Sequence, residues 1–335
     1  MQVVVEAQYK FDISVVIVSL NTCNVLRECL ESVRRESRSL RVQIIVVDNG
    51  SSDGSQEMVE REFPEAVLIR SNVNLGFGGA NNLGFQSAGG RYIVLLNSDA
   101  FLTEGALERS VRHMDEDQKV GLGGGRLVGR DGSLQPSARK FPTLLDDLIV
   151  RSGLAARFPQ SRFFGRFDRT WASVMEPAEV DWVPGAYSII RADLLATAGP
   201  FDPRFFLYYE EVDLCKRIKH LGYSVCYWPD ISIIHIGGES SRQMRSVEMS
   251  KVGRQLILWR MRSTLLYYRK HSGVIVTTLA MLLEVLWYWQ RFLRLRFSSD
   301  PNRRAIADSE KRQAATMARA WRETRGGKLS PAQPW

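Results

Sequence analysis

The first third of the chain alternates between two patterns, and this alternation limits the possible folds more than any other feature. Runs of β-branched and apolar residues predict strands at 13–18, 42–47, 66–70 and 92–96. Between them, residues 25–34 carry an apolar stripe at helical spacing, and residues 56–63 follow an N-cap signal, so both predict helices. The alternation indicates an α/β fold with a doubly wound, mainly parallel sheet flanked by helices.

Length and composition are those of a globular enzyme-sized chain. With 335 residues, of which 44% are hydrophobic and 24% charged, it can bury the core of one large or two smaller domains. Its four cysteines have no zinc-ligand spacing, and no charged-then-apolar leader segment is seen at its start. We therefore expect a cytoplasmic protein with reduced cysteines.

The net charge of +8 is distributed unevenly. Residues 242–296 contribute a net +9 and residues 300–335 a further +4, so the part before residue 242 is net acidic. No zinc finger, basic zipper or RNP-like motif accompanies these charges, and we expect no nucleic-acid partner.

Within the basic region, arginines border an apolar run at residues 273–289. This composition is typical of an interfacial anchor, so we expect residues 260–296 to bind a membrane surface, with an amphipathic helix packed on the protein as the alternative. The run is about 17 residues long, against about 20 for a spanning helix, and Glu284 lies inside it, which favours a helix in the membrane plane. We divide the chain into an α/β domain at 1–241, a basic helical region at 242–299 and a loosely ordered basic tail at 300–335.

Polar side chains stand where the predicted strands end. Asn21, Asp48 and Asp99 each follow a strand, and doubly wound sheets bind ligands beyond the carboxyl ends of their strands. Asp48 can accept hydrogen bonds from a base or a ribose, with capping of the next helix as its alternative role, and Asn49 is similarly placed. Asp99 is a candidate metal ligand, with a solvated turn as the alternative.

A glycine-rich segment at residues 74–84 fits neither the G-x-G-x-x-G nor the P-loop pattern. Its glycines permit close approach of the backbone to a phosphate or a sugar, and a flexible connector is the alternative. We expect Asn74, Gly76 and Asn81 to bind the donor side of a substrate. Either this Gly-rich loop or the segment at 129–175 is expected to close over the site and exclude water.

Three acidic residues, Glu210, Glu211 and Asp213, cluster between aromatic and apolar neighbours. Like charges held close together raise one another's pKa, so a structural reason for the cluster is hard to find. A carboxylate at the mouth of a pocket can act as general base towards an attacking hydroxyl. The alternative is a helix whose first turn carries acids.

Together these segments resemble the family 2 glycosyltransferases with the GT-A fold, particularly their bacterial rhamnosyltransferase-like branch. The resemblance covers about residues 12–240 and is carried by residues 14–18 with Asn21, 47–55, 72–84, 96–99, 183–186, 199–202 and 209–214. It implies that residues 1–241 form a GT-A nucleotide-sugar-binding and catalytic domain.

The resemblance implies a donor site and a metal site. Asp48 corresponds to the residue that binds the nucleotide base, and Asn21 lines the same pocket. Asn97 and Ser98 are also implied to bind the donor. Asp99 is similar to the last acid of the D-x-D metal element, in which Asn97 here replaces the first acid. His235 resembles the histidine that completes the metal site in some members, and such a mixed ligand set suits Mn²⁺ or Mg²⁺.

The same resemblance assigns the chemistry to Glu211. It matches the catalytic base, a position where Asp is commoner, and implies one displacement with inversion and no covalent glycosyl-enzyme. Glu210 and Asp213 are then supporting residues that orient the acceptor or hold a neighbouring helix.

The acceptor side is implied by residues 181–186. Asp181 and Trp182, before Gly185, resemble an acceptor-side wall, and core packing is the alternative for Trp182. We expect a dTDP- or UDP-sugar as donor, with rhamnose favoured by likeness to its branch. A glycan or lipid-linked glycan is the expected acceptor, at the inner face of the cell membrane.

Two other classes of function remain open. The replacement of the first metal acid by Asn97 is compatible with a non-catalytic nucleotide-sugar-binding assembly subunit. A sugar nucleotidyltransferase has a related sheet, although residues 19–22 offer neither the glycine nor the lysine usual after its first strand.

Overall fold

The computed structural model of the chain describes residues 9–237 and 239–331, without the side chains of residues 239–254. The described chain divides into two compact units. The first comprises Met1–Asp202 with Glu211–Gln243, and the second comprises Pro203–Glu210 with Met244–Trp335.

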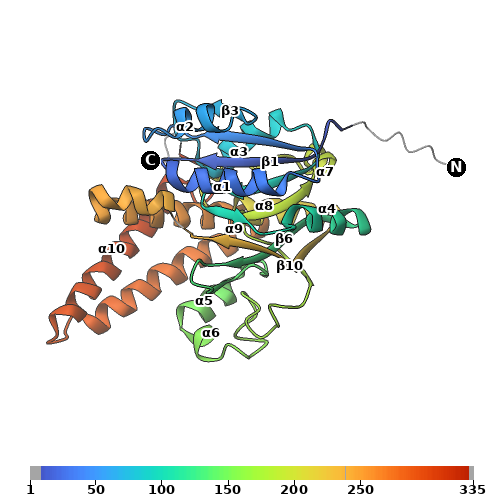
Figure 1. The fold of residues 1–335 in the computed structure, drawn as a ribbon. Coiled ribbons are helices and arrows are strands. Elements are labelled where there is room, and N and C mark those ends of the chain that lie inside the picture. Colours follow the sequence, from blue (N-terminus) through green and yellow to red (C-terminus); the bar gives the residue numbers. More distant parts are fainter. Residues whose placement is uncertain (1–8, 238, 332–335) are drawn as a thin grey trace. The chain divides into compact units, whose positions relative to one another are not determined.

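The first unit is built on one mixed sheet (Figure 1). Its strands are β1 (Phe11–Ser19), β2 (Val42–Asp48), β3 (Val67–Arg70), β4 (Gly90–Asn97), β5 (Ala100–Leu102), β6 (Val120–Val128), β7 (Leu134–Gln135), β8 (Ala178–Val180), β9 (Tyr187–Arg191) and β10 (Ser224–His235). The order is β3-β2-β1-β4-β9-β6-β10-β5, with β7 paired to β6 and β8 to β10. The strands β3, β2, β1 and β4 are parallel, as predicted, and β9 runs antiparallel between β4 and β6.

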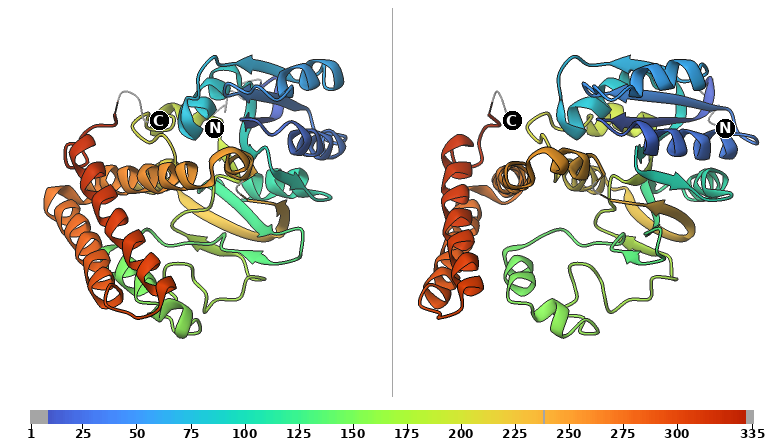
Figure 2. Two further views of the ribbon diagram at one scale, coloured as in Figure 1. Left: turned by 90° about the vertical axis from the view of Figure 1, so that its left-hand side faces the viewer. Right: turned by 60° about the vertical axis from the view of Figure 1, so that its left-hand side comes forward.

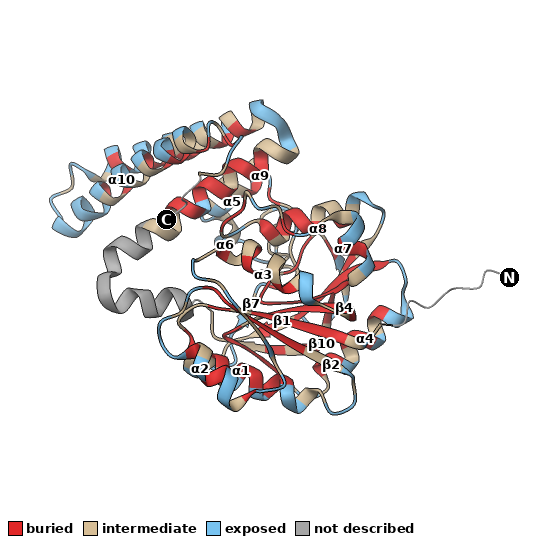
Figure 3. Ribbon diagram, turned by 90° about the horizontal axis from the view of Figure 1, so that it is seen from above, coloured by how far each residue is buried: buried red, intermediate tan, exposed pale blue. Residues whose placement is uncertain are grey.

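Helices cover both faces of this sheet. Those with residues in the first unit are α1 (Cys23–Glu36), α2 (Ser55–Glu62), α3 (Gly76–Ser87), α4 (Ala106–Glu116), α5 (Leu144–Arg151), α6 (Leu154–Arg157), α7 (Ala192–Ala198) and α8 (Glu210–His220). Successive residues of a strand point to opposite faces. Ile13, Val15 and Ile17 of β1 therefore share one core with apolar residues of α1, α2 and α4, whereas Val16 faces α3. Figure 3 shows the central strands coloured as buried.

The glycine-rich segment is helix α3, so the prediction of an open Gly-rich loop was wrong. A Cβ at Gly84 would collide with Cγ1 of Val16 and would lie 3.3 Å from Cγ2 of Val47. Glycine at this position lets the helix approach β1 and β2 closely. The close contact between α3 and the sheet therefore explains why residue 84 is glycine. The sequence alone could not show whether this glycine serves helix–sheet packing or phosphate binding.

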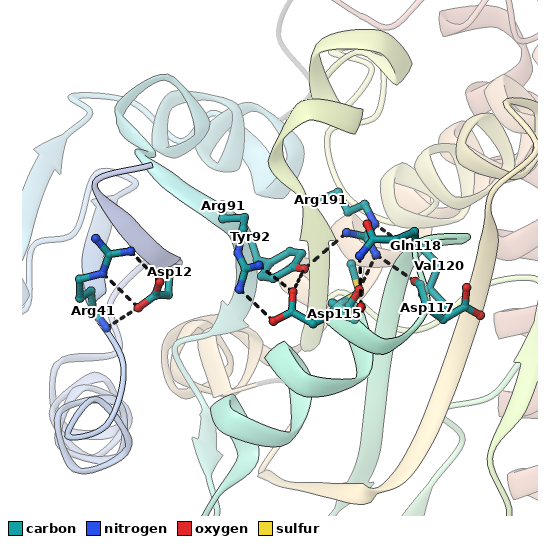
Figure 4. Close-up of polar contacts among 10 residues, drawn as sticks. Asp12, Arg41, Arg91, Tyr92, Asp115, Asp117, Gln118, Val120 and Arg191 are labelled. Atoms are coloured by element: carbon teal, nitrogen blue, oxygen red, sulfur yellow. Dashed lines mark hydrogen bonds and ion pairs between the residues drawn. The ribbon is translucent and has the colours of Figure 1, made fainter. Parts of the chain in front are cut away.

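Charged groups near the starts of the parallel strands have partners (Figure 4). Arg91 pairs with Asp115 at 2.7 Å, and Arg191 donates to the carbonyl oxygen of Val120 at 2.7 Å. Burial, together with a hydrogen bond to Asp115, raises the pKa of Tyr92 to about 12. These contacts stabilise the sheet at the edge opposite to the one where the candidate site lies.

The second unit contains helices α9 (Glu239–Leu295) and α10 (Pro301–Glu323). Gly273 has φ of +81°, a left-handed conformation that interrupts the regular course of α9. Figure 2 shows α9 changing direction along its length and α10 running back beside its second part.

The prediction of a loosely ordered tail at 300–335 was wrong for residues 301–323, which form α10. Asp300 caps this helix and Pro301 follows at its start. Buried Ala314, Met317 and Ala320 share a core with residues of α9, and Glu310 pairs with Arg291 at 2.8 Å. Its polar composition hid the alanine and methionine stripe that packs on α9, and residues 332–335 lie outside the described chain.

The second part of α9 turns apolar side chains outward. Apart from Val274, which follows Gly273, its exposed large apolar residues lie at alternating spacings of four and three: Ile275, Leu279, Leu282, Leu286, Trp289 and Leu293. Thr277 and Glu284 are instead buried, and Glu284 accepts a hydrogen bond from Tyr288 at 3.0 Å. By length and composition alone, Gln255–Leu295 could cross a membrane, with a mean hydropathy of 1.5.

Candidate active site

The carboxyl ends of three neighbouring strands bring the predicted donor residues together. In the register of the sheet, Ser19 of β1 is beside Asp48 of β2, and Val18 of β1 is beside Asn97 of β4. Because β1 lies between the other two strands, Asp48 and the turn after Asn97 flank the end of β1. This is the edge at which parallel α/β sheets bind their ligands.

Asp48 retains an unused hydrogen-bond acceptor. The residue is 1% exposed, and its Oδ1 accepts from Ser51 N at 3.0 Å and from Gln56 Nε2 at 2.7 Å. Its Oδ2 is buried and has no hydrogen-bond partner among the residues that the structure describes. Such an orphaned oxygen is unfavourable unless a ligand donates to it. The side chain does not cap α2, and nothing in the sequence pointed to Gln56 as its partner.

Asn21 ties the loop after β1 to the turn after β2. Its backbone has φ of +52°, its N–H donates to Ser51 Oγ at 2.9 Å, and its Oδ1 accepts from Ser52 N at 2.8 Å. Asparagine tolerates this left-handed conformation better than most residues. The contacts fix the two loops that border Asp48.

Four further predicted donor residues lie near or in α3: Asn49 follows β2, Asn74 precedes α3, Gly76 begins it and Asn81 lies inside it. Asn49 Nδ2 donates to Asn74 Oδ1 at 2.9 Å, and the same oxygen accepts from Gly76 N at 2.9 Å. Asn81 is buried and donates to the carbonyl oxygen of Phe77 at 2.9 Å. These bonds fix the start of α3 next to Asp48, and donor binding by the four residues stays a prediction.

Asp99 and His235 lie side by side. β10 pairs with β5 so that His235 is opposite Ala100, and His235 Nε2 lies 3.5 Å from Asp99 Oδ1. Asn97 Nδ2 lies 3.4 Å from the same nitrogen. Ser98 Oγ accepts from Thr22 Oγ1 at 3.0 Å, which fixes the turn to the loop after β1. Residues far apart in the sequence thus form one polar group.

Gln135 determines which nitrogen of His235 faces Asp99. Its Nε2 donates to the carbonyl oxygen of His235 at 2.8 Å, and its Oε1 lies 2.7 Å from His235 Nδ1. A backbone carbonyl only accepts, so the amide group of Gln135 must face it, and Oε1 must accept from a proton on Nδ1. In the neutral ring, the lone pair is then on Nε2, the atom beside Asp99. The sequence contained no signal for Gln135, because it acts through a strand pairing.

A divalent cation fits this group. Ligands of a six-coordinate ion at about 2.1 Å stand roughly 3 Å apart, comparable to the separation of Asp99 Oδ1 and His235 Nε2. Among the described residues, no cluster of three or more His, Cys, Asp and Glu side chains could hold a metal. The further ligands would therefore have to be substrate oxygens and water.

Glu211 lies close to the same strand ends. A Cβ at Gly185 would be 3.9 Å from Glu211 Cβ and 3.0 Å from Phe77 Cε1, so glycine lets these side chains approach. The next residue, Ala186, accepts from Asn97 N at 3.1 Å. Through these adjacent contacts, Glu211 is held near the turn that carries Asp99.

The carboxyl group of Glu211 is in an unfavourable setting for a charge. Its Oε2 is shielded from solvent and accepts no hydrogen bond from any described residue, although other parts of Glu211 are accessible. Burial raises the pKa of Glu211, while backbone N–H groups at the start of α8 and the charge of Arg139 oppose the rise. Sequence reasoning missed Arg139, which lies in the unpatterned segment at 129–175.

Backbone strain precedes α8. Tyr208 and Tyr209 have φ of +71° and +72°, in the left-handed region that non-glycine residues rarely adopt. Each such residue costs on the order of 1–3 kcal/mol, and strain of this kind is common at functional sites. Its position supports a functional reading of the acids that follow.

Glu210 and Asp213 are buried at the start of α8. Arg217 Nε donates to Asp213 Oδ2 at 2.9 Å, and the same guanidinium donates to the carbonyl oxygens of Gly199 and Pro200 at 2.9 and 2.8 Å. Asp213 therefore orients an arginine that holds a neighbouring loop on α8. Its contribution to acceptor binding, and that of Glu210, stay predictions.

Asp181 and Trp182 support Arg139. Asp181 Oδ2 accepts from Phe141 N at 2.9 Å, and the guanidinium of Arg139 lies 4.7 Å from the centre of the Trp182 ring. The ring is 6% exposed, and its Nε1 donates to the carbonyl oxygen of Lys140 at 2.8 Å. Trp182 is thus packed in this structure, and an acceptor wall at 181–182 stays a prediction.

The chain is similar in sequence to known glycosyltransferases. Residues 14–173 match the model of the family described as glycosyl transferase family 2. The chain is 28% identical over 210 residues to the N-acetylglucosaminyl-diphospho-decaprenol L-rhamnosyltransferase of Mycobacterium tuberculosis (strain CDC 1551 / Oshkosh), covering 58% of this chain and 66% of the relative. It is 25% identical over 264 residues to the rhamnosyltransferase WbbL of Escherichia coli (strain K12), covering 76% of this chain and 91% of the relative.

A solved structure of GalNAc-T7 with UDP, GalNAc and Mn²⁺ has a similar fold. The TM-score is 0.52 at 15% sequence identity, over 76% of this chain and 51% of that chain. This likeness bears on the fold alone and confirms the predicted GT-A class. Residues 14–173 are thus a glycosyl transferase family 2 segment, and the chain resembles the two bacterial rhamnosyltransferases named above.

Proposed function

We propose that the chain is an inverting glycosyltransferase that moves a sugar, with rhamnose favoured, from a nucleoside diphosphate to a hydroxyl group of a lipid-linked glycan. The relatives named above are rhamnosyltransferases, and one acts on a diphospho-decaprenol sugar. The observation that carries the proposal is Glu211, whose buried Oε2 has no partner and whose neighbour Gly185 adjoins the strand end of Asp99.

The donor base is assigned to Asp48. The free Oδ2 of this residue can accept an N–H of uracil or thymine, while Ser51 and Gln56 hold Oδ1 and fix the carboxylate plane. Both bases present an imide N–H, so UDP and dTDP sugars fit the same group.

Asp99 and His235 would hold Mn²⁺ or Mg²⁺ between the protein and the donor diphosphate. Such an ion supplies positive charge that stabilises the departing nucleoside diphosphate. Gln135 keeps the Nε2 lone pair of His235 available, and Asn97 contributes an amide group beside it. The loss of one acid at Asn97 leaves fewer charged ligands on the protein.

Glu211 removes the proton from the acceptor hydroxyl as the hydroxyl oxygen attacks the anomeric carbon of the donor sugar. The bond from that carbon to the diphosphate oxygen breaks in the same displacement, so the configuration inverts. A pKa raised by burial makes the carboxylate a stronger base than an exposed Glu. The positive charge of Arg139 opposes that rise of the pKa and so favours the ionised carboxylate that a general base requires.

The second part of α9 is proposed to lie on the inner face of the cell membrane. Its large apolar side chains point outward, with Ile275 and Leu286 at 74% and 63% exposure, whereas Thr277 and Glu284 point inward. This arrangement is the reverse of a soluble helix and matches a lipid surface. Flanking basic residues, including Arg294 and Arg296, would bind anionic headgroups.

A donor panel tests the function. UDP- and dTDP-sugars are incubated with the full chain, a prenyl-diphosphate-linked N-acetylglucosamine acceptor and Mn²⁺ or Mg²⁺, and nucleoside diphosphate release is measured with and without EDTA. We expect release with one donor, sensitivity to EDTA, and loss in Glu211→Gln. Equal release by wild type and Glu211→Gln would overturn the role of Glu211.

The same panel separates the other classes. An assembly subunit would bind the donor and release nothing with any acceptor. A nucleotidyltransferase would instead release pyrophosphate from a nucleoside triphosphate and a sugar phosphate.

A further inference from the structure

A cavity of about 230 Å³ lies in the first unit, beside the candidate active site and distinct from the groups assigned to the donor. It is bordered by the β6–β7 hairpin and by the loop at 168–174, with Arg126, Gln135, Ser137, Arg169, Val174 and Tyr227 in its lining. Pockets for whole drug-sized ligands are usually about 300–1,000 Å³, so this one suits a single group of a larger substrate.

Two cationic side chains in the lining lack anionic partners. Among the described residues, neither Arg126 nor Arg169 forms an ion pair, and Arg126 Nε is buried without any hydrogen-bond partner. Within the part of the chain that the structure describes, the Arg126 guanidinium has a single acceptor, the weakly accepting sulfur of Met175. Guanidinium groups bind phosphate oxygens in a forked geometry, so two unpaired arginines in one cavity indicate an anionic phosphate ligand.

The walls of the cavity are shared with the active site. Gln135 lines it and also holds Nδ1 of His235, while Nε2 of the same ring faces Asp99. Asp168 lines it and accepts from Arg139 Nε at 2.6 Å, and the charge of Arg139 acts on Glu211. The cavity therefore lies on the Nδ1 side of the imidazole, opposite to the side assigned to the donor diphosphate.

We propose that Arg126 and Arg169 bind the diphosphate group of the lipid-linked acceptor in this cavity. This inference rests on the proposed function and adds the means by which the acceptor is recognised. The pair of Asp168 and Arg139 links this cavity to Glu211, and a diphosphate bound there would discriminate against glycans that lack the lipid diphosphate. The apolar lining from Leu134, Pro136 and Val174 is compatible with the start of a lipid chain.

The site is tested with inorganic pyrophosphate as the probe. Isothermal titration of the full chain is run in EDTA, with UDP and dTDP present at saturating concentrations to fill the donor site. We expect Arg126→Met and Arg169→Met each to raise the Kd for pyrophosphate about tenfold, because each removes a charge-assisted pair of hydrogen bonds. The matched control is Arg157→Met in α6, whose guanidinium stacks on Phe158 outside the cavity lining.

Kinetics provide a second readout. In Arg126→Lys, which keeps the charge and loses the fork, we expect a higher KM for the diphosphate-linked acceptor, with kcat and the donor KM near those of the wild type. An increase confined to the donor KM would overturn the acceptor assignment. Unchanged pyrophosphate affinity in both methionine variants, or abolition of binding by UDP and dTDP in the wild type, would overturn the site.

Failure of this inference can be told apart from failure of the proposed function. If the chain binds pyrophosphate through Arg126 but releases no nucleoside diphosphate, the proposal of an anion site holds and the proposal of a transferase is overturned. A chain that releases nucleoside diphosphate, with pyrophosphate affinity indifferent to Arg126 and Arg169, keeps the transferase and overturns the site.

Discussion

At the scale of single residues, Asp48 and Glu211 each keep a carboxylate oxygen that is shielded from solvent and accepts no hydrogen bond. Leaving a buried acceptor unsatisfied costs about 1–3 kcal/mol, and more when the group is charged. Both unsatisfied oxygens are present in the fold. They belong to residues at the end of β2 and the start of α8, which lie at one edge of the sheet. A substrate that donates to Asp48 and gives its proton to Glu211 would relieve both deficits.

Glu211→Gln is expected to lower the activity of the chain and to raise the stability of its fold. Loss of a general base lowers kcat by about 10²–10⁴-fold. Because burial raises the pKa of Glu211 above 4.5, its stabilising contribution is complete below pH 4.5 and is lost as the pH rises through the folded-state value. Above pH 4.5 the burial of Glu211 therefore carries a free-energy cost that a neutral glutamine does not, so the variant should melt at a higher temperature than the wild type at neutral pH.

The measurements are nucleoside diphosphate release and thermal unfolding at pH 5 and pH 7. The gain in Tm should be larger at pH 7 than at pH 5, because burial penalises the carboxylate form of Glu211 and that form becomes more favoured as the pH rises. A variant less stable than the wild type at neutral pH would show that Glu211 is a structural residue.

Gln135→Met should weaken metal binding. The variant removes both the acceptor for His235 Nδ1 and the donor to its carbonyl oxygen, so the ring no longer has a fixed tautomer. Loss of such a supporting hydrogen bond typically lowers metal affinity about 10–100-fold. Free Mn²⁺ is measured by electron paramagnetic resonance on the donor-free protein.

Gln118→Met is the matched control for Gln135→Met. The side chain of Gln118 donates to Asp115 O at the opposite edge of the sheet. Mn²⁺ affinities that agree between Gln135→Met and Gln118→Met would rule out the positioning role of Gln135.

At the scale of secondary-structure elements, α3 and α8 are far apart in the sequence, and each places residues at the candidate site. Helix α3 lies close against β1 and β2 through Gly84, and its Phe77 contacts the position of Gly185. Helix α8 begins with the acids and follows two residues with positive φ. Gly84 and Gly185 therefore determine how closely α3 approaches the sheet and how closely Phe77 and Glu211 approach the loop before β9.

Gly84→Ala should destabilise the chain by about 1–3 kcal/mol, because the new Cβ would overlap Val16 Cγ1 and overpack the core. Urea unfolding followed by circular dichroism measures the change. Gly79→Ala on the same helix is the matched control, since its Cβ would meet only Leu75 Cβ at 3.2 Å. Alanine favours helix by about 1 kcal/mol over glycine, so this control should stay within that range of the wild type. Equal stability of both variants would contradict close packing at Gly84.

At the scale of the whole molecule, charge and apolar surface are divided between parts of the chain. The positive charge is concentrated after residue 242, and the outward apolar side chains of α9 lie in the same region. Contiguous exposed apolar surface usually marks an interaction site. Acidic groups of the catalytic fold are thus kept in a separate part of the sequence from the groups proposed to bind lipid.

Leu282→Gln combined with Leu286→Gln should reduce binding to vesicles of phosphatidylglycerol and phosphatidylcholine about tenfold or more. Burial of one leucine contributes about 1.5–3 kcal/mol. Flotation of the full chain with vesicles measures binding. The matched control replaces two exposed apolar residues elsewhere, Val67→Gln with Leu221→Gln. Equal loss in both double variants, or no loss in either, would contradict membrane binding through α9.

Sequence patterns predicted the parallel strands, the helices α1 and α2, and the ends at which polar residues follow a strand. These features are local, because β-branched runs, apolar stripes and turn residues act over a few neighbours. The predictions failed for α3 and α10. In α3 a high glycine content suggested a loop, and in α10 a polar composition hid a narrow packing stripe. Tertiary contacts outweighed local composition in both cases.

The sequence by itself determined the order of elements, the α/β class and the acids at the ends of strands, since each follows from the spacing of side chains along the chain. Only the tertiary structure decided that Gln135 orients His235, that Arg139 acts on Glu211, and that two arginines with no ion-pair partner among the described residues border one cavity. Those relations join residues that are distant in sequence, and burial and hydrogen-bond direction exist only once the strands are paired.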